Sequence, residues 1–248
     1  MGRFLFHSSL ILGLTLLTQV GGLAWLLAMT VKRRVLAFLT LYVLLTVVAS
    51  FTAPLFGRQA LSCWQTGPLQ MQSWTYCVLN RNYASPEVIH ALNAAATSLD
   101  SQFKGTKTLV LDLNFPFLDG FPLLPHLSHD DGEKADLAFF YRDENGYLPG
   151  VTRSPLGYFA FEYGSETCPP RWPSLRWDLR FLQPIWRDLQ VEPKRTAALV
   201  RHLSDNPSIG KIFLEPHLKS HLNLTSDKIR FQGCRAARHD DHIHLQLN

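Results

Sequence analysis

The first 56 residues are strongly apolar, whereas the rest of the chain alternates between apolar and polar positions. Two long apolar runs, over residues 4–31 and 35–56, contain His7 and Tyr42 as their only ionisable side chains. Each run exceeds the roughly 20 residues that a helix needs to cross a bilayer. The pattern therefore predicts a membrane anchor over residues 1–56, made of two transmembrane helices that form a hairpin.

A short basic loop, Lys32-Arg33-Arg34, separates the two runs, and none of the 20 Asp and Glu residues lies before residue 57. Because basic loops stay in the cytoplasm, both ends of the hairpin and the domain that follows are expected on the outer side. A cleavable signal peptide in place of the first helix is one alternative, and it would leave the same orientation. Two buried core helices of a soluble protein are the other.

Beyond the anchor, the pattern of apolar positions predicts one α+β domain on a small antiparallel or mixed sheet. Helical spacing predicts one helix that begins at Pro86, after an N-cap at Ser85, and a second from Pro193 to about Asp205. Alternating positions predict strands over residues 107–115, 135–141, 209–214, 228–233 and 242–247. Residues 142–184 are rich in Gly, Pro and Arg, and we expect a long surface excursion there, where substrate contacts gather.

The charge distribution gives no support for a nucleic-acid partner. Four of the 24 Lys and Arg residues lie in the membrane anchor, which leaves 20 basic and 20 acidic residues in the domain of residues 57–248. That domain is formally neutral, so the net charge of +4 is the charge of the anchor. We therefore expect no nucleic-acid binding.

All four cysteines follow the apolar runs. An even number in an outward-facing, oxidising compartment predicts two disulfides. Among the three possible pairings we expect Cys63 with Cys77 and Cys168 with Cys234. Four unpaired buried thiols are the alternative. Zinc ligation by the cysteines is disfavoured because no Cys-x2-Cys spacing occurs.

Two clusters of histidines, more than a hundred residues apart, indicate a metal site. The first holds His126, His129 and Asp136, and the second holds His239, His242 and His244. A catalytic zinc takes three ligands from histidine and carboxylate side chains and keeps a fourth position for water. His129, Asp136 and His244 could supply these three ligands.

The expected strand geometry assigns a role to a further histidine. Alternate residues of a strand share a face, so His242 and His244 point the same way. Zinc lowers the pKa of its bound water to about 7 and polarises the carbonyl under attack. His242 is the candidate general base, because its ordinary pKa of about 6.5 suits proton transfer. His126 and His239 are expected to line the site, where they orient ligands or stabilise the tetrahedral intermediate.

These motifs resemble those of a known family. The pattern His126-x2-His129-x2-Gly132-x3-Asp136, paired with a terminal His239-x2-His242-x-His244, is similar to that of the penicillin-insensitive murein endopeptidases. They belong to the wider lysostaphin, D-Ala-D-Ala peptidase and hedgehog-like zinc group. The resemblance covers about residues 108–247. The chain departs from the family in its membrane hairpin and in the stretch Glu133-Lys134-Ala135.

The resemblance implies a hedgehog/D-Ala-D-Ala peptidase-like domain over residues 57–248 that hydrolyses peptide cross-links of peptidoglycan. It implies Zn²⁺ held by His129, Asp136 and His244, with His242 as the catalytic histidine and with His126 and His239 near the metal. It also implies the bacterial inner membrane as the location, with the catalytic domain on the periplasmic side.

Two alternative functions stay open. One is a zinc-binding envelope protein without turnover, and the other is a hydrolase of another amide or ester. The presence of His242 favours catalysis, because a protein that only binds zinc needs no proton acceptor beside it. In the surface excursion, a group of basic and aromatic side chains could grip a carboxylate-rich glycopeptide, although a solvated face is the alternative for each: Arg171, Arg176, Arg180, Trp172 and Trp177.

Overall fold

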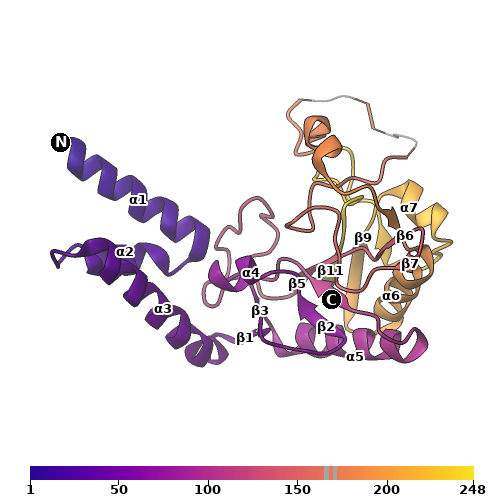
Figure 1. Cartoon of the computed structure of the whole chain (residues 1–248), viewed down its shortest axis with the longest axis horizontal. Helices are drawn as coiled ribbons and strands as arrows, with labels where there is room; N and C mark the ends of the chain where they lie inside the picture. The colour runs from indigo at the N-terminus through magenta and orange to yellow at the C-terminus, as the bar shows by residue number, and fades with distance from the viewer. Residues whose placement is uncertain (165–167, 170–171) are drawn as a thin grey trace. The chain divides into compact units, whose positions relative to one another are not determined.

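The computed structural model describes residues 1–164, 168–169 and 172–248, and it contains two compact units (Figure 1). Unit 1 comprises residues 1–62, 74–86 and 112–134, and unit 2 comprises residues 63–73, 87–111 and 135–248. The apolar N-terminal helices therefore share one compact unit with the segment that carries His126 and His129. Arg171 lies outside the described residues.

In unit 1 the first apolar run forms two helices, where the sequence predicted one helix over residues 4–31. Helix α1 (Gly2–Thr18) ends at Gln19, which has a φ of 65°, and α2 (Gly21–Ala28) packs back against α1. Gly22 permits the close approach, because a Cβ there would lie 1.9 Å from Oγ1 of Thr15. The run turns back on itself because its polar break at Gln19 is followed by two glycines.

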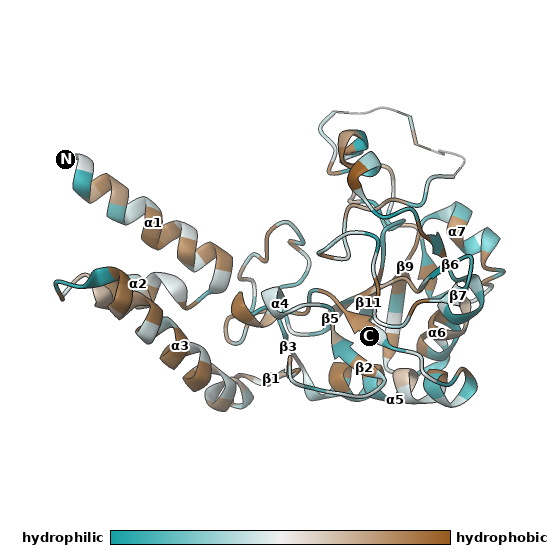
Figure 2. Cartoon of the chain, viewed as in Figure 1, coloured by the Kyte–Doolittle hydropathy of each residue, from teal (hydrophilic) through white to brown (hydrophobic). Residues whose placement is uncertain are grey.

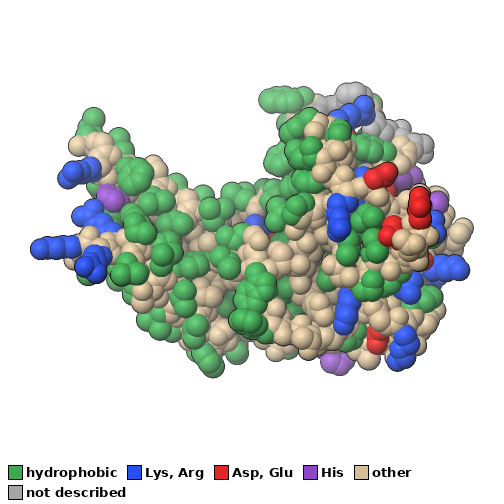
Figure 3. Space-filling view, in the orientation of Figure 1, with side chains coloured by type: hydrophobic (Ala, Val, Ile, Leu, Met, Phe, Trp, Pro, Cys, Tyr) green, Lys and Arg blue, Asp and Glu red, His purple; other side chains and the backbone are tan. Residues whose placement is uncertain are grey.

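Contacts among the helices of unit 1 place the N-terminus at the same end as the basic loop. Nε1 of Trp25 donates to Nδ1 of His7 at 3.2 Å, and the Trp25 ring lies 5.5 Å from the ring of Phe38 in α3 (Arg34–Thr52). His7, Trp25 and Phe38 are thus at one level. Figure 3 shows Lys and Arg side chains gathered at this end of the helices. The sequence prediction had placed the N-terminus at the opposite end.

Among the described residues, one helix is long and apolar enough to cross a membrane. It is α3 with the 3-10 turn η1 (Ala53–Phe56), which together give 23 residues of mean hydropathy 2.3, against 17 residues for α1 (Figure 2). Only 6% of its most apolar window is buried, unlike the core helix of a soluble protein. Its length and composition suit a membrane anchor or a signal sequence.

The rest of unit 1 packs along α3 from its middle to its C-terminal end. Strand β1 (Gln59–Ala60) pairs with β3 (Tyr83–Ala84) in antiparallel orientation, and the short helix α4 (Trp74–Val78) precedes β3. Tyr83 packs on Ala49 and Ala53 of α3, with Phe117 beside them.

Segment 112–134 of unit 1 has little regular structure, and side chains hold it in place. Arg58, 2% exposed, donates to the carbonyl of Phe115 at 2.7 Å and pairs with Asp119. The Asn114 carboxamide accepts from Gly132 N at 3.1 Å and donates to Lys134 O at 2.9 Å. The segment that carries two candidate histidines is therefore closed by hydrogen bonds at both ends.

Unit 2 contains a mixed six-stranded sheet in the order β10-β9-β11-β5-β4-β2. Its strands are β2 (Leu69–Met71), β4 (Thr108–Val110), β5 (Lys134–Ala138), β9 (Ile209–Phe213), β10 (Ile229–Arg230) and β11 (His242–Leu247). The β2/β4 and β9/β10 pairs are parallel, whereas β4/β5 and β9/β11 are antiparallel. The predicted α+β class with a mixed sheet is confirmed.

The helices of unit 2 follow the sequence prediction more closely than its strands do. Helices α5 (Pro86–Gln102) and α6 (Pro193–Asp205) form as predicted, and Glu192 caps α6 by accepting from Arg195 N at 2.6 Å. The pattern did not predict β2, the helix α7 (Pro216–His221), or a three-stranded sheet of β6 (Tyr141–Asp143), β7 (Gly146–Tyr147) and β8 (Gln190–Val191). The surface excursion includes most of β6, all of β7 and most of the 3-10 turn η2 (Arg180–Ile185).

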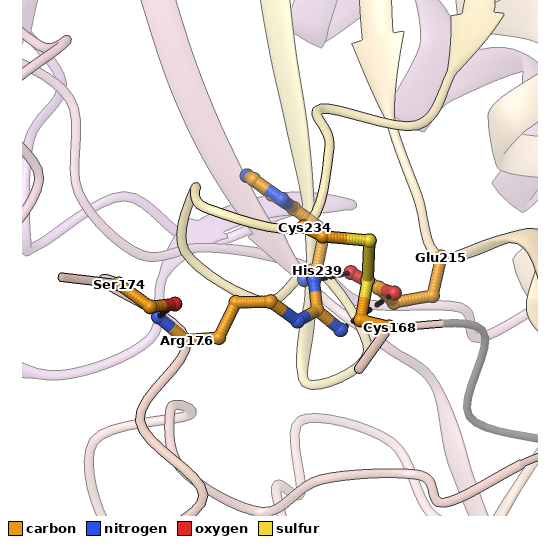
Figure 4. Close-up of a disulfide and its surroundings, with 6 residues drawn as sticks. All are labelled: Cys168, Ser174, Arg176, Glu215, Cys234 and His239. Carbon is orange, nitrogen blue, oxygen red and sulfur yellow. Dashed lines mark hydrogen bonds and ion pairs between the residues drawn. A yellow bond between two sulfur atoms is a disulfide. The ribbon is translucent and has the colours of Figure 1, made fainter. Parts of the chain in front are cut away.

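Both predicted disulfides form. Cys168 is bonded to Cys234 with the Cα atoms 5.3 Å apart (Figure 4). Cys63 and Cys77 are also disulfide-bonded, and no cysteine is free. The predicted pairing is confirmed, and it suits a protein outside the cytoplasm.

Gly157, within the surface excursion, provides a test of how the excursion packs on Leu111. Gly157 has a φ of +80°, and a Cβ there would lie 2.4 Å from Cδ2 of Leu111. Gly157→Ala should lower the free energy of unfolding by roughly 2–4 kcal/mol, from the left-handed backbone and from overpacking. Gly150→Ala is the control, with a similar φ of +70° and open space, and should cost only about 1–2 kcal/mol. Both variants are measured by thermal unfolding of the detergent-solubilised protein. Equal losses of stability would contradict the predicted overpacking against Leu111.

Candidate metal centre

Adjacent strands of the unit 2 sheet bring a carboxylate and two histidines together. Asp136 lies on β5, and His242 and His244 lie on the neighbouring strand β11. Oδ1 of Asp136 is 2.8 Å from Nδ1 of His244, and Oδ2 is 3.7 Å from Nε2 of His242. All three side chains are buried. The prediction that His242 and His244 share a face of the strand is confirmed.

The Asp136 carboxylate is oriented by a residue that the sequence reasoning missed. The hydroxyl of Tyr158 donates to Oδ2 of Asp136 at 2.7 Å, and the Tyr158 ring lies edge-on to His242 with centroids 5.0 Å apart. Tyr158 comes from the surface excursion, where substrate contacts were expected, and the sequence offered no signal for this tyrosine. Its hydrogen bond turns Oδ1 of Asp136 towards His244.

His242 has a carboxylate partner of its own. Oδ1 of Asp241 lies 2.5 Å from Nδ1 of His242, and Oδ2 of Asp241 accepts from Phe159 N at 2.6 Å. Because an ionised carboxylate only accepts, Nδ1 of His242 carries the proton and Nε2, which faces Asp136, presents its lone pair. A nucleophile's base and its orienting acid have this arrangement in hydrolases. Asp241 precedes the predicted base directly, and that adjacency was the only sequence signal.

Aromatic rings pack around the two strand histidines. Phe213 of β9 stacks on His244 with centroids 5.4 Å apart and 25° between planes. The His239 ring lies 5.0 Å from that of His242 and 5.6 Å from that of His244. His239 therefore lies beside both strand histidines.

In unit 1, segment 112–134 orients the two remaining histidines. Nδ1 of His129 is 2.6 Å from the carbonyl oxygen of Leu113. A carbonyl only accepts, so this ring nitrogen carries the proton and Nε2 is the nitrogen with the lone pair. The His126 ring lies 5.8 Å from that of His129. Buried metal-binding histidines are commonly oriented by such a second hydrogen bond.

His126 is held by a buried ion pair that sequence reasoning did not find. Nδ1 of His126 lies 3.1 Å from Oδ2 of Asp112, and the Asp112 carboxylate pairs with Arg81 at 2.6 Å. Burial alone would raise the pKa of Asp112, but the Arg81 guanidinium and the His126 contact outweigh it, so the pKa lies below its ordinary value. No spacing in the sequence links Arg81 to Asp112.

Three of the candidate residues form a group that could hold a metal ion. His126, His129 and Asp136 offer one ligand atom each, and these atoms lie within 4.8 Å of one another. The predicted ligand set has His244 in place of His126, and His244 lies against Asp136 as described above. Histidine nitrogens with one carboxylate oxygen suit zinc and also other divalent first-row ions.

Among the basic and aromatic residues of the excursion, Arg176 is paired within the protein. Arg176 forms a two-pronged ion pair with Glu215, at 3.0 and 2.9 Å, beside the Cys168–Cys234 disulfide (Figure 4). Glu215 also accepts from the backbone N of His239 at 3.3 Å. Arg176 thus binds a carboxylate of its own chain.

The other members of that group lie at the surface. Arg180 pairs with Asp178, and Trp172 and Trp177 are 94% and 51% exposed.

Comparison of the chain with protein-family models and with curated protein sequences finds no match.

The Arg81–Asp112 pair can be tested through pH. Because the pKa of Asp112 is depressed in the folded protein, its contribution to stability is present above the unfolded pKa of about 3.9 and is lost as pH falls through the folded value. Asp112→Asn leaves Arg81 buried without its counter-charge and should cost about 3–5 kcal/mol at pH 7. Chemical unfolding from pH 7 to pH 3 should show this difference shrinking below about pH 4. A difference that is constant over this range would contradict the assignment.

Proposed function

We propose that this chain is a membrane-anchored zinc metallopeptidase that hydrolyses peptide cross-links of peptidoglycan on the periplasmic side of the bacterial inner membrane. The observation that carries the proposal is the buried carboxylate of Asp136, with His244 on one oxygen and the Asp241–His242 pair facing the other. The proposal includes a hedgehog/D-Ala-D-Ala peptidase-like fold for the catalytic domain. The mixed sheet that holds these residues is compatible with that fold.

In the proposal, His129, Asp136 and His244 hold the ion. The donor chemistry supports this set, because His129 presents the lone pair of Nε2 and Asp136 presents Oδ1 towards His244. Oδ1 of Asp136 and Nδ1 of His244 are 2.8 Å apart, which is a hydrogen-bond distance, so an ion held by both atoms would take the place of the proton between them. When bound, the zinc supplies Lewis acidity and a water of lowered pKa.

His242 is the proposed general base. Its Nε2 would accept the proton of the attacking water, and the Asp241 carboxylate would stabilise the imidazolium that results. The same nitrogen would then return the proton to the leaving amine. Tyr158 keeps the Asp136 carboxylate in place throughout, because its hydroxyl donates to the oxygen that faces His242.

His126 and His239 border the proposed site. His126 is fixed by Asp112, and His239 lies against the rings of His242 and His244. From these positions they would orient the ligands or stabilise the oxyanion of the tetrahedral intermediate.

The compartment and the substrate are supported by separate observations. Two disulfides and an apolar helix of 23 residues suit an envelope protein whose larger part lies outside the cytoplasm. The resemblance of the histidine motifs to murein endopeptidases supports a peptide of peptidoglycan as the substrate. A zinc-binding protein without turnover is less well supported, because it has no need for the proton acceptor that Asp241 orients. A hydrolase of another amide or ester uses the same groups.

The metal assignment predicts that the purified full-length chain binds about one equivalent of zinc. His244→Ala should weaken zinc binding by at least roughly 100-fold, since even the loss of an outer partner costs 10–100-fold. His90→Ala, on the exposed face of α5, is the control and should keep its metal. Elemental analysis and competition with a chelator measure the affinity. Equal zinc content in the two variants would remove His244 from the ligand set.

The base assignment predicts that Asp241→Asn retains zinc but lowers kcat by about 10²–10⁴-fold, because His242 loses the group that fixes its tautomer. The readout is release of cross-link peptides from purified sacculi, measured by mass spectrometry with and without a chelator. Asp188→Asn, at an exposed position, is the matched control. An unchanged kcat in Asp241→Asn would reassign the base, and intact sacculi with the metal-loaded wild type would reject the substrate.

A further inference from the structure

A polar cluster lies against the middle of the apolar helix α3. Asn80 is fully buried, and its Nδ2 donates to the Tyr42 hydroxyl at 3.2 Å and to Oγ1 of Thr46 at 3.4 Å. The Tyr42 hydroxyl in turn donates to the carbonyl of Val78, the last residue of α4. Tyr42 is 14 residues from Phe56, the end of the apolar helix. At 1.5 Å per residue, Tyr42 lies about 20 Å from Phe56 along the axis of α3. The end of α4, which Tyr42 contacts, therefore lies at that level of the helix.

The same cluster closes the turn between α1 and α2. The carbonyl of Thr18, at the end of α1, accepts from Nδ2 of Asn80 at 3.4 Å, and Oγ1 of Thr18 accepts from Gly21 N at 2.9 Å. The Gln19 side chain accepts from Phe117 N at 3.0 Å. A helix end leaves backbone groups without intrahelical partners. In a bilayer such groups are tolerated only where protein surrounds them.

The exposed surface of helices α1 to α4 is apolar. Exposed hydrophobic side chains cover α1, α2 and α3 and continue onto α4, namely Leu12, Leu17, Leu23, Leu26, Val43, Val47, Trp74 and Val78. The basic residues of this region gather at one end of the helices, and no acidic residue precedes Glu87 (Figure 3). An apolar belt with basic charge at one end matches a bilayer whose cytoplasmic face lies at that end.

We propose that α1 and α2 form a re-entrant hairpin that enters the bilayer from the cytoplasmic side and turns back within it. Helix α4 and Asn80 enter the same bilayer from the outer side and cap that turn. The occupant of the apolar surface of α4 is lipid hydrocarbon. The inference rests on the proposed membrane anchoring of α3, and it replaces the predicted hairpin of two complete spans.

The arrangement ties the anchor to the segment that carries candidate metal ligands. Phe117, which donates to Gln19 at the turn, belongs to the same segment 112–134 as His126 and His129. That segment is therefore fixed directly to the membrane-embedded turn, whereas a flexible linker would leave it independent of the anchor.

The test is cysteine accessibility in the full-length chain with its native disulfides kept. Val78→Cys and Trp74→Cys, at exposed positions of α4, are compared with Asn145→Cys in the exposed β6–β7 turn. In spheroplasts, a membrane-impermeant maleimide should label both α4 variants at least tenfold more slowly than Asn145→Cys, and detergent should remove the difference. Arg3→Cys should be labelled only after the inner membrane is opened.

Each contrary result has a separate meaning. Labelling of both α4 variants at the rate of Asn145→Cys in spheroplasts would place α4 in water and overturn the capping. Labelling of Arg3→Cys from outside would overturn the re-entrant hairpin in favour of a complete first span. Recovery of the chain in the soluble fraction after a carbonate wash would instead reject the membrane anchor of the proposed function. Zinc content and sacculus digestion test the catalytic part independently.

Discussion

The buried carboxylate of Asp136 is the group on which the candidate site depends. It is 0% exposed, and burying a charge is costly unless hydrogen bonds, counter-charges or a metal compensate. Tyr158 supplies a hydrogen bond to one oxygen, and His244 lies against the other. The requirement to satisfy this single charge therefore fixes the positions of side chains from β5, from β11 and from the surface excursion. A cation shared with His129 and His244 would complete the compensation.

Hydrogen-bond acceptors fix the tautomer of three of the histidines. A carboxylate lies at Nδ1 of both His126 and His242, and a backbone carbonyl lies at Nδ1 of His129. Each partner can only accept, so in each ring the proton is held on Nδ1 and Nε2 presents its lone pair. Ligation and proton transfer both require an unprotonated nitrogen aimed at the reacting atoms. The protein thus selects one tautomer by placing acceptors behind the rings, and the supporting residues are as necessary as the histidines in front of them.

The parts of this arrangement that the sequence predicts are those with a local period or a local composition. Alternation along β11 predicts that His242 and His244 share a face, and helical spacing predicts α5 and α6. The orienting residues are different, because Asp112 and Tyr158 reach their partners only through tertiary packing and no spacing marks them. The reversal at Gln19 was missed for a related reason. Apolar composition shows that a run is compatible with a membrane, but the end of a helix depends on local backbone groups and on the remote side chain of Asn80.

The central claim is that side chains of Asp136, His129 and His244 converge on one divalent ion. The most direct measurement is X-ray absorption fine structure at the zinc edge of the purified full-length chain. The account predicts one zinc per chain, with nitrogen and oxygen ligands alone at about 2.0–2.1 Å and with the scattering pattern of histidine rings. A sulfur ligand at about 2.3 Å, or an oxygen-only shell without histidine scattering, would contradict it.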